Sequence, residues 1–393
     1  MKGIAAEGVR RKITWADEIR FVRLSHLRSA IIIQTGFDIC SVPVIGNYCF
    51  LRCITLDANI GCFVLSGNPV KRGVSVEYLI YVNLKFGKNL YHKELIKMER
   101  KPIFTGAASA LITPMTSSGV DYENFRKLIN WQIEEGIDAL VIAGTSGEAS
   151  TLTDEEHREV LKFAVEVVDG RVPVIAGTGS NDTDYAIDLT KYACEIGCDA
   201  MLVVTPYYNK ATQKGLIKMF TAIADASTKP VILYNVPSRT GVNIEPATYA
   251  ALADHPMIQG IKEANGQIDK ITETMALCGD KLDLYSGNDD QIVPLMSVGG
   301  KGVISVLSNV LPKETSEMVH KFQNGDVKGA AEMQFKYFGL IKALFSEVNP
   351  IPAKAAMAAM GFCEDYVRLP LTVMEDATKA VLLDKMREAG LDV

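Results

Sequence analysis

The chain lacks a run of apolar residues long enough to cross a bilayer, which takes about 18 or more, so we expect no membrane-spanning helix. Its eight cysteines contain no C-x-x-C pair, and its five histidines are scattered, so no metal-ligand cluster is indicated. Positive charge is not in excess either. A net charge of −6 makes nucleic acids and anionic membranes unsuitable general partners.

A secretory signal is also missing from the start of the sequence, where no compact apolar run precedes a small-residue cleavage site. Without such a signal, the cysteines are best interpreted as reduced, buried thiols. We therefore expect a reducing, cytoplasmic compartment. What remains is a chain of ordinary composition, with 48% hydrophobic and 22% charged residues.

Residues 1–97 differ from the rest of the chain in charge and pattern. They hold 14 Lys and Arg against seven Asp and Glu, a net charge of +7, so the remainder carries −13 of the total of −6. They show no clean helical or strand period. A targeting peptide would be basic, but also Ser-rich and nearly free of acids. An accessory domain is a second interpretation. We favour a third, a poorly ordered upstream extension without function, with Met98 as the true start.

From Phe104 onward, short apolar runs alternate with stretches of helical pattern. The runs are rich in Val, Ile, Leu and Ala, which is typical of strands buried on both faces. The expected strands are 108–113, 139–143, 172–176, 200–205, 231–235, 258–262, 282–286 and 302–306. The expected helices are 122–135, 154–168, 182–196, 213–226, 246–253, 267–278, 291–298 and 313–322. Thr153 and Glu156 have the spacing of a capping box at one helix start.

Eight such units predict an α/β fold, a closed (β/α)8 barrel over residues 98–323. An open doubly wound sheet is the rival, but the G-x-G-x-x-G turn that would bind a phosphate after its first strand is absent. Three further helical stretches, 326–347, 351–360 and 372–389, predict a C-terminal helical subdomain over residues 324–393.

Lys262 is the sharpest candidate for chemistry, because it ends an apolar strand at the carboxyl face where barrel enzymes place their active sites. Desolvation there lowers the pKa of an ammonium group, and a neutral amine can attack a ketone to form an imine. Tyr234 lies at matching depth one strand earlier and can pass protons. The alternatives are a lysine that reaches water or pairs with Glu263, and a tyrosine with a wet hydroxyl.

Other polar side chains follow the same face of the predicted barrel. Thr145 and Ser146 stand in a turn flanked by Gly144 and Gly147, where hydroxyls and backbone N–H groups suit a carboxylate. Arg239 follows a Pro-Ser turn and offers a bidentate fork to a carboxylate. Plain turn chemistry and a surface salt bridge are the respective alternatives.

These motifs together resemble the dihydrodipicolinate synthases of the N-acetylneuraminate lyase superfamily. The matching strings are Gly144–Glu148, Tyr234–Gly241, Gly260–Ala264, Asn349–Lys354 and Arg368–Leu371. The resemblance covers about residues 98–393 and none of residues 1–97. It implies a lyase that condenses pyruvate with aspartate semialdehyde in lysine and diaminopimelate biosynthesis. No cofactor or catalytic metal is implied.

The resemblance also implies a role for each matching residue. Lys262 forms the imine, and Tyr234, Thr145 and Tyr208 form a proton relay, with Tyr208 reaching into a neighbouring subunit of a homotetramer (a dimer of dimers). Ser146 takes the pyruvate carboxylate, in a position where many members have threonine. Arg239, Gly287 and Ile304 belong to the substrate pocket. A possible regulatory site consists of Ser150, His157, Asn181 and Tyr207.

Two other functions remain open at this point. An aldolase of the same superfamily that acts on a keto sugar acid would keep Lys262 and Tyr234, but would not need Arg239 in its Pro-Ser-Arg-Thr-Gly string. A non-catalytic metabolite-binding paralogue would not need to keep Lys262, Tyr234 and Thr145.

The resemblance also bears on regulation. Members inhibited by lysine place a glutamate where Tyr185 now stands, so we expect weak or absent feedback inhibition.

Overall fold

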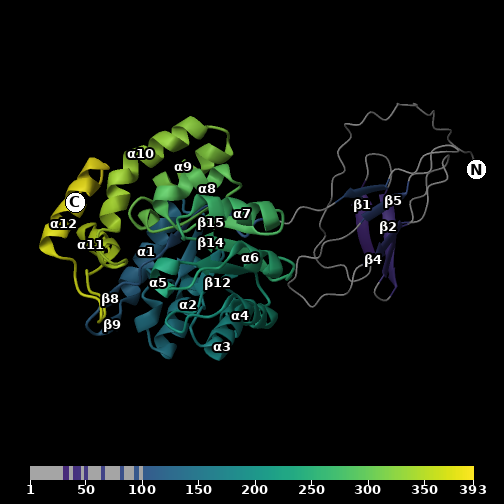
Figure 1. The fold of residues 1–393 in the computed structure, drawn as a ribbon, viewed down its shortest axis with the longest axis horizontal. Coiled ribbons are helices and arrows are strands. Elements are labelled where there is room, and N and C mark those ends of the chain that lie inside the picture. Colours follow the sequence, from purple (N-terminus) through teal and green to yellow (C-terminus); the bar gives the residue numbers. More distant parts are fainter. Residues whose placement is uncertain are drawn as a thin grey trace, which may run out of the picture. The chain divides into compact units, whose positions relative to one another are not determined.

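The structure, a computed structural model, describes residues 101–393 and, among residues 1–100, six short strands alone. The chain divides into two compact units, Met1–Arg100 and Lys101–Val393 (Figure 1). In the first unit, four strands form one sheet and two form a pair. These are β1 (Ala30–Gln34), β2 (Ile39–Ile45), β3 (Tyr48–Leu51) and β4 (Phe63–Ser66), then β5 (Ile80–Asn83) and β6 (Lys93–Ile96). The prediction that residues 1–97 are poorly ordered falls mainly on residues that lie outside the described part of the chain.

The second unit is built on a closed barrel of eight parallel strands, which confirms the predicted fold class. Each strand pairs with the next in the chain, and the last pairs with the first. The strands are β7 (Gly106–Ala110), β10 (Ala139–Ile142), β11 (Val174–Gly177), β12 (Ala200–Val204), β13 (Val231–Asn235), β14 (Ile258–Glu263), β15 (Asp283–Ser286) and β16 (Gly302–Ser305). All but one of their residues are buried, as the apolar runs predicted, and Val204 is half-buried.

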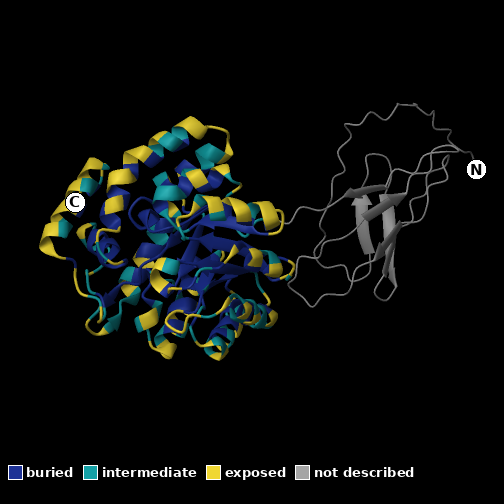
Figure 2. Ribbon diagram, viewed as in Figure 1, coloured by how far each residue is buried: buried dark blue, intermediate teal, exposed yellow. Residues whose placement is uncertain are grey.

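Helices connect the strands and surround them (Figure 1). They are α1 (Tyr122–Glu134), α2 (Asp154–Val168), α3 (Thr183–Glu195), α4 (Gln213–Ala226), α6 (Pro246–Leu252), α7 (Ile268–Cys278), α8 (Ile292–Ser297) and α9 (Pro312–Gln323). The predicted capping box is confirmed at α2, where Thr153 Oγ1 accepts from Glu156 N and Glu156 Oε2 accepts from Thr153 N. Figure 2 shows buried strands inside and exposed residues on the outer helix faces.

Most barrel elements begin and end within two residues of the expected bounds, and three differences are larger. The first strand covers 106–110 rather than 108–113. Beyond Ala110 the chain bonds to turns instead: the Ile112 N–H donates to Asn309 Oδ1, and Thr113 Oγ1 donates to the Gly147 carbonyl. One additional helix, α5 (Pro237–Thr240), lies where the sequence indicated a Pro-Ser turn. A short hairpin of β8 (Met115–Thr116) and β9 (Gly119–Val120) was also not predicted.

Aromatic stacking fills part of the barrel interior. Phe104 stacks on Tyr285 with 4.2 Å between ring centroids, and the Tyr285 hydroxyl donates to the Phe104 carbonyl at 2.9 Å. Small residues such as Ala108, Ala139 and Ala200 complete the same apolar cluster, which also contains Tyr234 and Ile304. The side chains of the site therefore stand on a close-packed core.

Three helices follow the barrel, over the residues expected to form a C-terminal subdomain: α10 (Val327–Leu344), α11 (Ile351–Ala359) and α12 (Asp376–Glu388). In Figure 1 α10 lies beside α9, and α11 and α12 lie beyond it. The helix α12 begins at Asp376 rather than at the expected residue 372, because the chain stays extended through Glu375, whose N–H donates to Glu347. Among the described residues, no helix is long and apolar enough to cross a membrane.

Candidate active site

Lys262 and Tyr234 face each other from neighbouring strands. The two residues are register partners in the pairing of β13 with β14, and Lys262 Nζ lies 4.2 Å from the centroid of the Tyr234 ring. Both side chains are buried, with 5% and 6% of their surface exposed. Among the residues that the structure describes, none forms an ion pair or hydrogen bond with the Lys262 amine. The structure thus brings together the amine and the phenol, as predicted.

The electrostatics around Lys262 favour its neutral form. Burial lowers the pKa of Lys262 to about 7, and the charge of Arg239 acts in the same direction, while Asp289 opposes it. Asp289 itself is buried, and its Oδ2 accepts from the N–H groups of Val306 and Leu307. Burial raises the pKa of Asp289, while its hydrogen bonds to Leu307 N and Val306 N lower it. An amine that is partly neutral near pH 7 is suited to nucleophilic attack.

Glu263 does not pair with Lys262, which removes the alternative of a local ion pair. Its carboxylate accepts from Asn235 Nδ2 at 2.9 Å, from the Tyr249 hydroxyl at 2.9 Å and from Asn265 N at 2.9 Å. Successive strand residues point to opposite sides, so Glu263 lies behind the strand that carries Lys262. Because Asn235 and Glu263 are register partners, their hydrogen bond helps to hold Tyr234 level with Lys262.

The turn after β10 carries Thr145 and Ser146 into the same region. Burial raises the pKa of the Tyr234 phenol. The charge of Arg239 and a hydrogen bond from the Thr145 side chain both lower it. The predicted need for glycine is confirmed at Gly147, where a Cβ atom would lie 3.1 Å from Ala143 N. A side chain at Gly177 on β11 would be excluded even more strictly, since an added Cβ atom would lie 2.1 Å from the Ala143 carbonyl oxygen. This turn can therefore pack directly on the barrel mouth.

A buried ion pair holds the end of this turn. Glu148 has a left-handed backbone conformation with φ 55°, and its carboxylate pairs with the Lys354 ammonium from α11. The two side chains are 1% and 0% exposed. Lys354 Nζ also donates to the Tyr366 carbonyl at 2.8 Å, and the Arg368 N–H donates to Glu148 at 3.2 Å. The C-terminal subdomain is in this way tied to the catalytic face of the barrel.

Ser146 and Arg239 are both linked to one residue, Asn349, which lies between α10 and α11. Asn349 Nδ2 donates to Ser146 Oγ at 3.0 Å, and Arg239 Nη2 donates to the Asn349 carbonyl at 3.2 Å. Ser146 and Asn349 are buried, whereas Arg239 is exposed at the mouth of the site. The two predicted carboxylate-binding groups are thus found together, and the residue that joins them was not predicted.

Gly287 and Ile304 also lie at this end of the barrel. The Gly287 N–H donates to the Glu263 carbonyl at 2.8 Å, and a Cβ atom on Gly287 would lie 2.8 Å from that of Ala264. Ile304 on β16 is buried in the same apolar cluster as Tyr234. Both positions fit the wall of a small pocket.

Tyr208 is the predicted site residue that the single chain does not bring to the others. Its side chain is 92% exposed, and its backbone has φ 71°, a conformation that is uncommon for a residue with a bulky side chain. The neighbouring Tyr207 is 36% exposed.

The four predicted regulatory residues lie in different environments. His157 is buried, its Nε2 is 2.9 Å from the Gly177 carbonyl, and burial lowers its pKa. The Asn181 carbonyl accepts from Asn209 Nδ2, while Ser150 and Tyr207 are exposed. Near them, Tyr185 hydrogen-bonds to Asp154, which together with burial raises its pKa to about 12.

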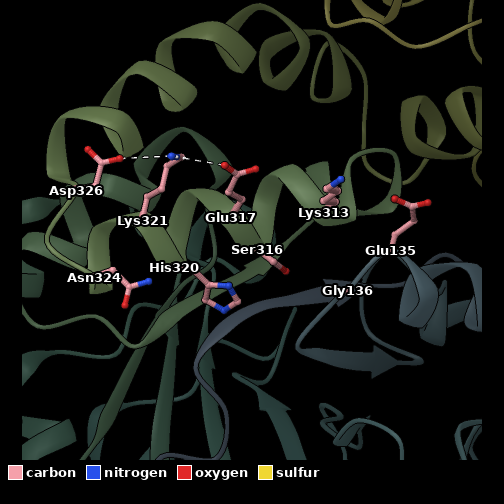
Figure 3. Close-up of a pocket in the computed structure, with 9 residues that line it drawn as sticks. All are labelled: Glu135, Gly136, Lys313, Ser316, Glu317, His320, Lys321, Asn324 and Asp326. Atoms are coloured by element: carbon pink, nitrogen blue, oxygen red, sulfur yellow. Dashed lines mark hydrogen bonds and ion pairs between the residues drawn. The ribbon is translucent and has the colours of Figure 1, made fainter.

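Two cavities in the described part of the chain differ in how they relate to the site. One of about 340 Å³ lies at the carboxyl ends of β13, β14 and β15 and is lined by residues that include Ser238, Ala264, Asn288, Asp289 and Lys342. It adjoins the candidate site. The other, of about 550 Å³, runs along α9 and the turn before β10. Figure 3 shows its lining, which includes Lys313, Ser316, His320 and Lys321 but no predicted site residue.

The Dihydrodipicolinate synthetase family model matches residues 103–389, which is most of the chain and all of the barrel strands. The chain belongs to this family. Residues 1–100 lie outside the match, as the resemblance indicated. Among the described residues, no group of three or more His, Cys, Asp or Glu side chains could hold a metal ion.

Relatives in the family are similar over almost their whole length. The 4-hydroxy-tetrahydrodipicolinate synthase of Acetivibrio thermocellus is 54% identical over 292 residues, which are 74% of this chain and 99% of that protein. The crystal structure of the chloride-inhibited dihydrodipicolinate synthase of Acinetobacter baumannii with pyruvate is 43% identical, with a TM-score of 0.71. It covers 73% of this chain and 99% of its own. The crystal structure of DHDPS from Cyanidioschyzon merolae with lysine bound is 39% identical, with a TM-score of 0.72. The match covers 74% of this chain and 99% of that one.

Three residues that support the site were assigned no role from the sequence, although Asn349 and Lys354 belong to one of the matching strings. Asp289 lies near Lys262 but follows the next strand, and its buried position depends on the turn after β16. Asn349 reaches Ser146 across 203 residues of sequence. Lys354 gave a usable signal, because it is the one charged residue in the apolar helix Ile351–Ala359, and such a cation needs a buried carboxylate.

Proposed function

We propose that this chain is a 4-hydroxy-tetrahydrodipicolinate synthase, a lyase that condenses pyruvate with L-aspartate 4-semialdehyde on the way to lysine and diaminopimelate. The single observation that carries the proposal is Lys262, a buried amine without an ion pair among the described residues, with a pKa of about 7, beside Tyr234. Membership of the family and about 50% identity to relatives with this name support it.

The first step forms the imine. The neutral amine of Lys262 attacks the ketone carbon of pyruvate, and loss of water leaves a C=N bond. The Tyr234 phenol, hydrogen-bonded to Thr145, is placed to give a proton to the leaving hydroxide and to take one back. The steps call for no cofactor or catalytic metal.

The second stage forms the carbon–carbon bond. Loss of a methyl proton converts the imine to an enamine, whose carbon attacks the aldehyde carbon of the semialdehyde. The α-amine of the second substrate then replaces Lys262 at the imine carbon, closing a six-membered ring and freeing the lysine. Arg239 holds the carboxylate of the semialdehyde, and Ser146 holds that of pyruvate. Gly287 and Ile304 line the pyruvate pocket.

The assembly is part of the proposal. We propose that Tyr208 completes the proton relay of a neighbouring subunit within a homotetramer, and its 92% exposure and left-handed backbone support a role outside its own chain. A cytoplasmic location is also proposed, and the four described cysteines, which are free thiols, are in keeping with a reducing compartment.

A comparison of substrates tests this function. The full chain is supplied with pyruvate and aspartate semialdehyde, and in parallel with sialic acid and keto-deoxy-gluconate. The condensation product should form, and neither sugar acid should be cleaved at a comparable kcat/KM. Preferred cleavage of a sugar acid would instead identify an aldolase of the same superfamily. Binding of pyruvate without any turnover would identify a metabolite-binding protein.

A further inference from the structure

Asn349 stands between the two groups that the proposed function assigns to the two substrate carboxylates. It belongs to the connection between α10 and α11 in the C-terminal subdomain, far from Ser146 and Arg239 in sequence. Only 5% of its surface is exposed. A buried amide in such a place is retained only if its hydrogen bonds are made.

The side chain of Asn349 fixes what the Ser146 hydroxyl can do. The shorter of the two contacts runs from Asn349 Nδ2 to Ser146 Oγ, at 3.0 Å, whereas Oδ1 lies at 3.4 Å. A hydroxyl has one hydrogen to donate and two lone pairs that accept. When the Asn349 amide donates to a lone pair of Ser146 Oγ, the hydrogen of the Ser146 hydroxyl can be donated to another acceptor. A carboxylate can only accept, so this orientation suits pyruvate.

The main chain of Asn349 acts on the other side. Its carbonyl accepts from Arg239 Nη2 at 3.2 Å, which uses one of the five guanidinium donors. The remaining donors can still form a bidentate contact with a carboxylate. Because the side chain serves Ser146 and the carbonyl serves Arg239, a substitution at position 349 changes the first contact and leaves the second chemically intact.

We propose that Asn349 is a positioning residue, which orients the Ser146 hydroxyl as a donor to the pyruvate carboxylate and seats Arg239 through its carbonyl. The inference rests on the proposed function. It assigns the C-terminal subdomain a part in substrate affinity, and it predicts that loss of the Asn349 amide acts on pyruvate through Ser146.

The test compares Asn349→Ala, Asn349→Asp, Ser146→Ala and the double variant Ser146→Ala/Asn349→Ala in steady-state kinetics. Asn349→Ala should raise the KM for pyruvate several-fold, with kcat and the KM for the semialdehyde within about twofold. Asn349→Asp should raise the KM for pyruvate more, by about 10-fold to 100-fold. Its carboxylate accepts the hydrogen bond that Ser146 would otherwise donate to pyruvate, and its charge repels the pyruvate carboxylate. The exposed Asn324→Ala is the matched control, and it should change neither constant.

The double variant separates positioning from folding. In the Ser146→Ala background, Asn349→Ala should have no further effect on the KM for pyruvate, since the hydroxyl through which it acts is gone. Additive effects, or equal losses for both substrates, would overturn the inference. Borohydride trapping of pyruvate on the unsubstituted chain keeps the two proposals apart. A normal pyruvate adduct with additive losses rejects the role of Asn349 alone, whereas no adduct rejects the proposed function and the inference with it.

Discussion

At the scale of single residues, burial at one end of a strand sets the chemistry of this protein. Lys262 has an ordinary side chain whose amine is made reactive by desolvation, with Asp289 and Arg239 acting on it in opposite directions. The identity of the amine could be predicted, because strand pattern and position alone place a lysine at the barrel mouth. The direction of its pKa followed from burial, but the part played by Asp289 required the tertiary structure.

Replacement of Arg239 by alanine should affect the second substrate more than pyruvate. A charged hydrogen bond contributes about 1.5–3 kcal/mol, so the KM for aspartate semialdehyde should rise about 10-fold to 100-fold. Steady-state kinetics with each substrate varied in turn would measure this, with the exposed Arg387→Ala as control. An equal loss for both substrates would mean that Arg239 supports the fold instead.

Residue predictions were most complete where the chemistry lies in a local motif. Tyr234, Thr145 and Lys262 stand at the ends of parallel strands or in the turns that follow them, and the carboxyl ends of such strands meet on one face. Asn349 could not be found in this way, because its partners lie in two distant segments of the chain. Only the packing of the C-terminal subdomain brings them together.

At the scale of elements, the predicted strands and helices were close to those observed, and the differences have local causes. Apolar runs indicated all the barrel strands, since each is buried on both faces. The helix α5 was missed because a four-residue helix that starts with proline has the sequence of a turn. The hairpin of β8 and β9 is too short to show an alternating pattern.

The ion pair that joins the turn after β10 to α11 should be costly to break. Lys354→Met leaves the Glu148 carboxylate buried without its counter-ion, so the free energy of unfolding should fall by about 3–5 kcal/mol. Denaturant unfolding would measure the loss. The double variant Glu148→Gln/Lys354→Met should recover part of it, because no charge then stays unpaired. Lys328→Met, in an exposed pair with Glu332, should cost less than about 1 kcal/mol. A similar small loss for Lys354→Met would contradict this account.

The region around α3 predicts weak inhibition by lysine. By the resemblance, Tyr185 occupies a position where inhibited members are expected to have a glutamate. Its hydroxyl hydrogen-bonds to Asp154, which is already paired with Arg158 at 2.8 Å. Asp182 cannot replace the missing carboxylate easily, since its Oδ1 caps α3. Without a carboxylate partner, the α-ammonium of a bound lysine loses several kcal/mol of binding free energy. A contact with the face of the Tyr185 ring would restore only about 0.5–2 kcal/mol of it.

An activity assay with added lysine checks this prediction. Half-inhibition should require more than about 1 mM lysine, because each 1.4 kcal/mol lost is a tenfold loss of affinity. Tyr185→Glu should restore sensitivity. Half-inhibition of the unsubstituted chain well below about 1 mM would show that another acid, such as Asp182 or Asp184, binds the ligand's ammonium group.

At the scale of the whole molecule, the family match and the second compact unit cover nearly the same residues. The match spans 103–389 and the unit spans Lys101–Val393, while relatives align over 98–99% of their own length with 74% of this chain. We therefore expect residues 1–97 to be dispensable. A chain that starts at Met98 should keep its kcat/KM and its thermal midpoint within experimental scatter. Loss of folding on truncation would show instead that these residues stabilise the barrel.

The central claim is that Lys262 is the covalent catalyst, and borohydride trapping tests it most directly. With pyruvate present, borohydride should leave a reduced pyruvyl group on Lys262, located by mass spectrometry of peptides, and Lys262→Ala should carry no label. The neutral amine becomes more abundant as the pH rises through the pKa of about 7, so the rate of labelling should rise across that pH and then level off. A label on any other lysine, or none at all with the unsubstituted chain, would contradict the account.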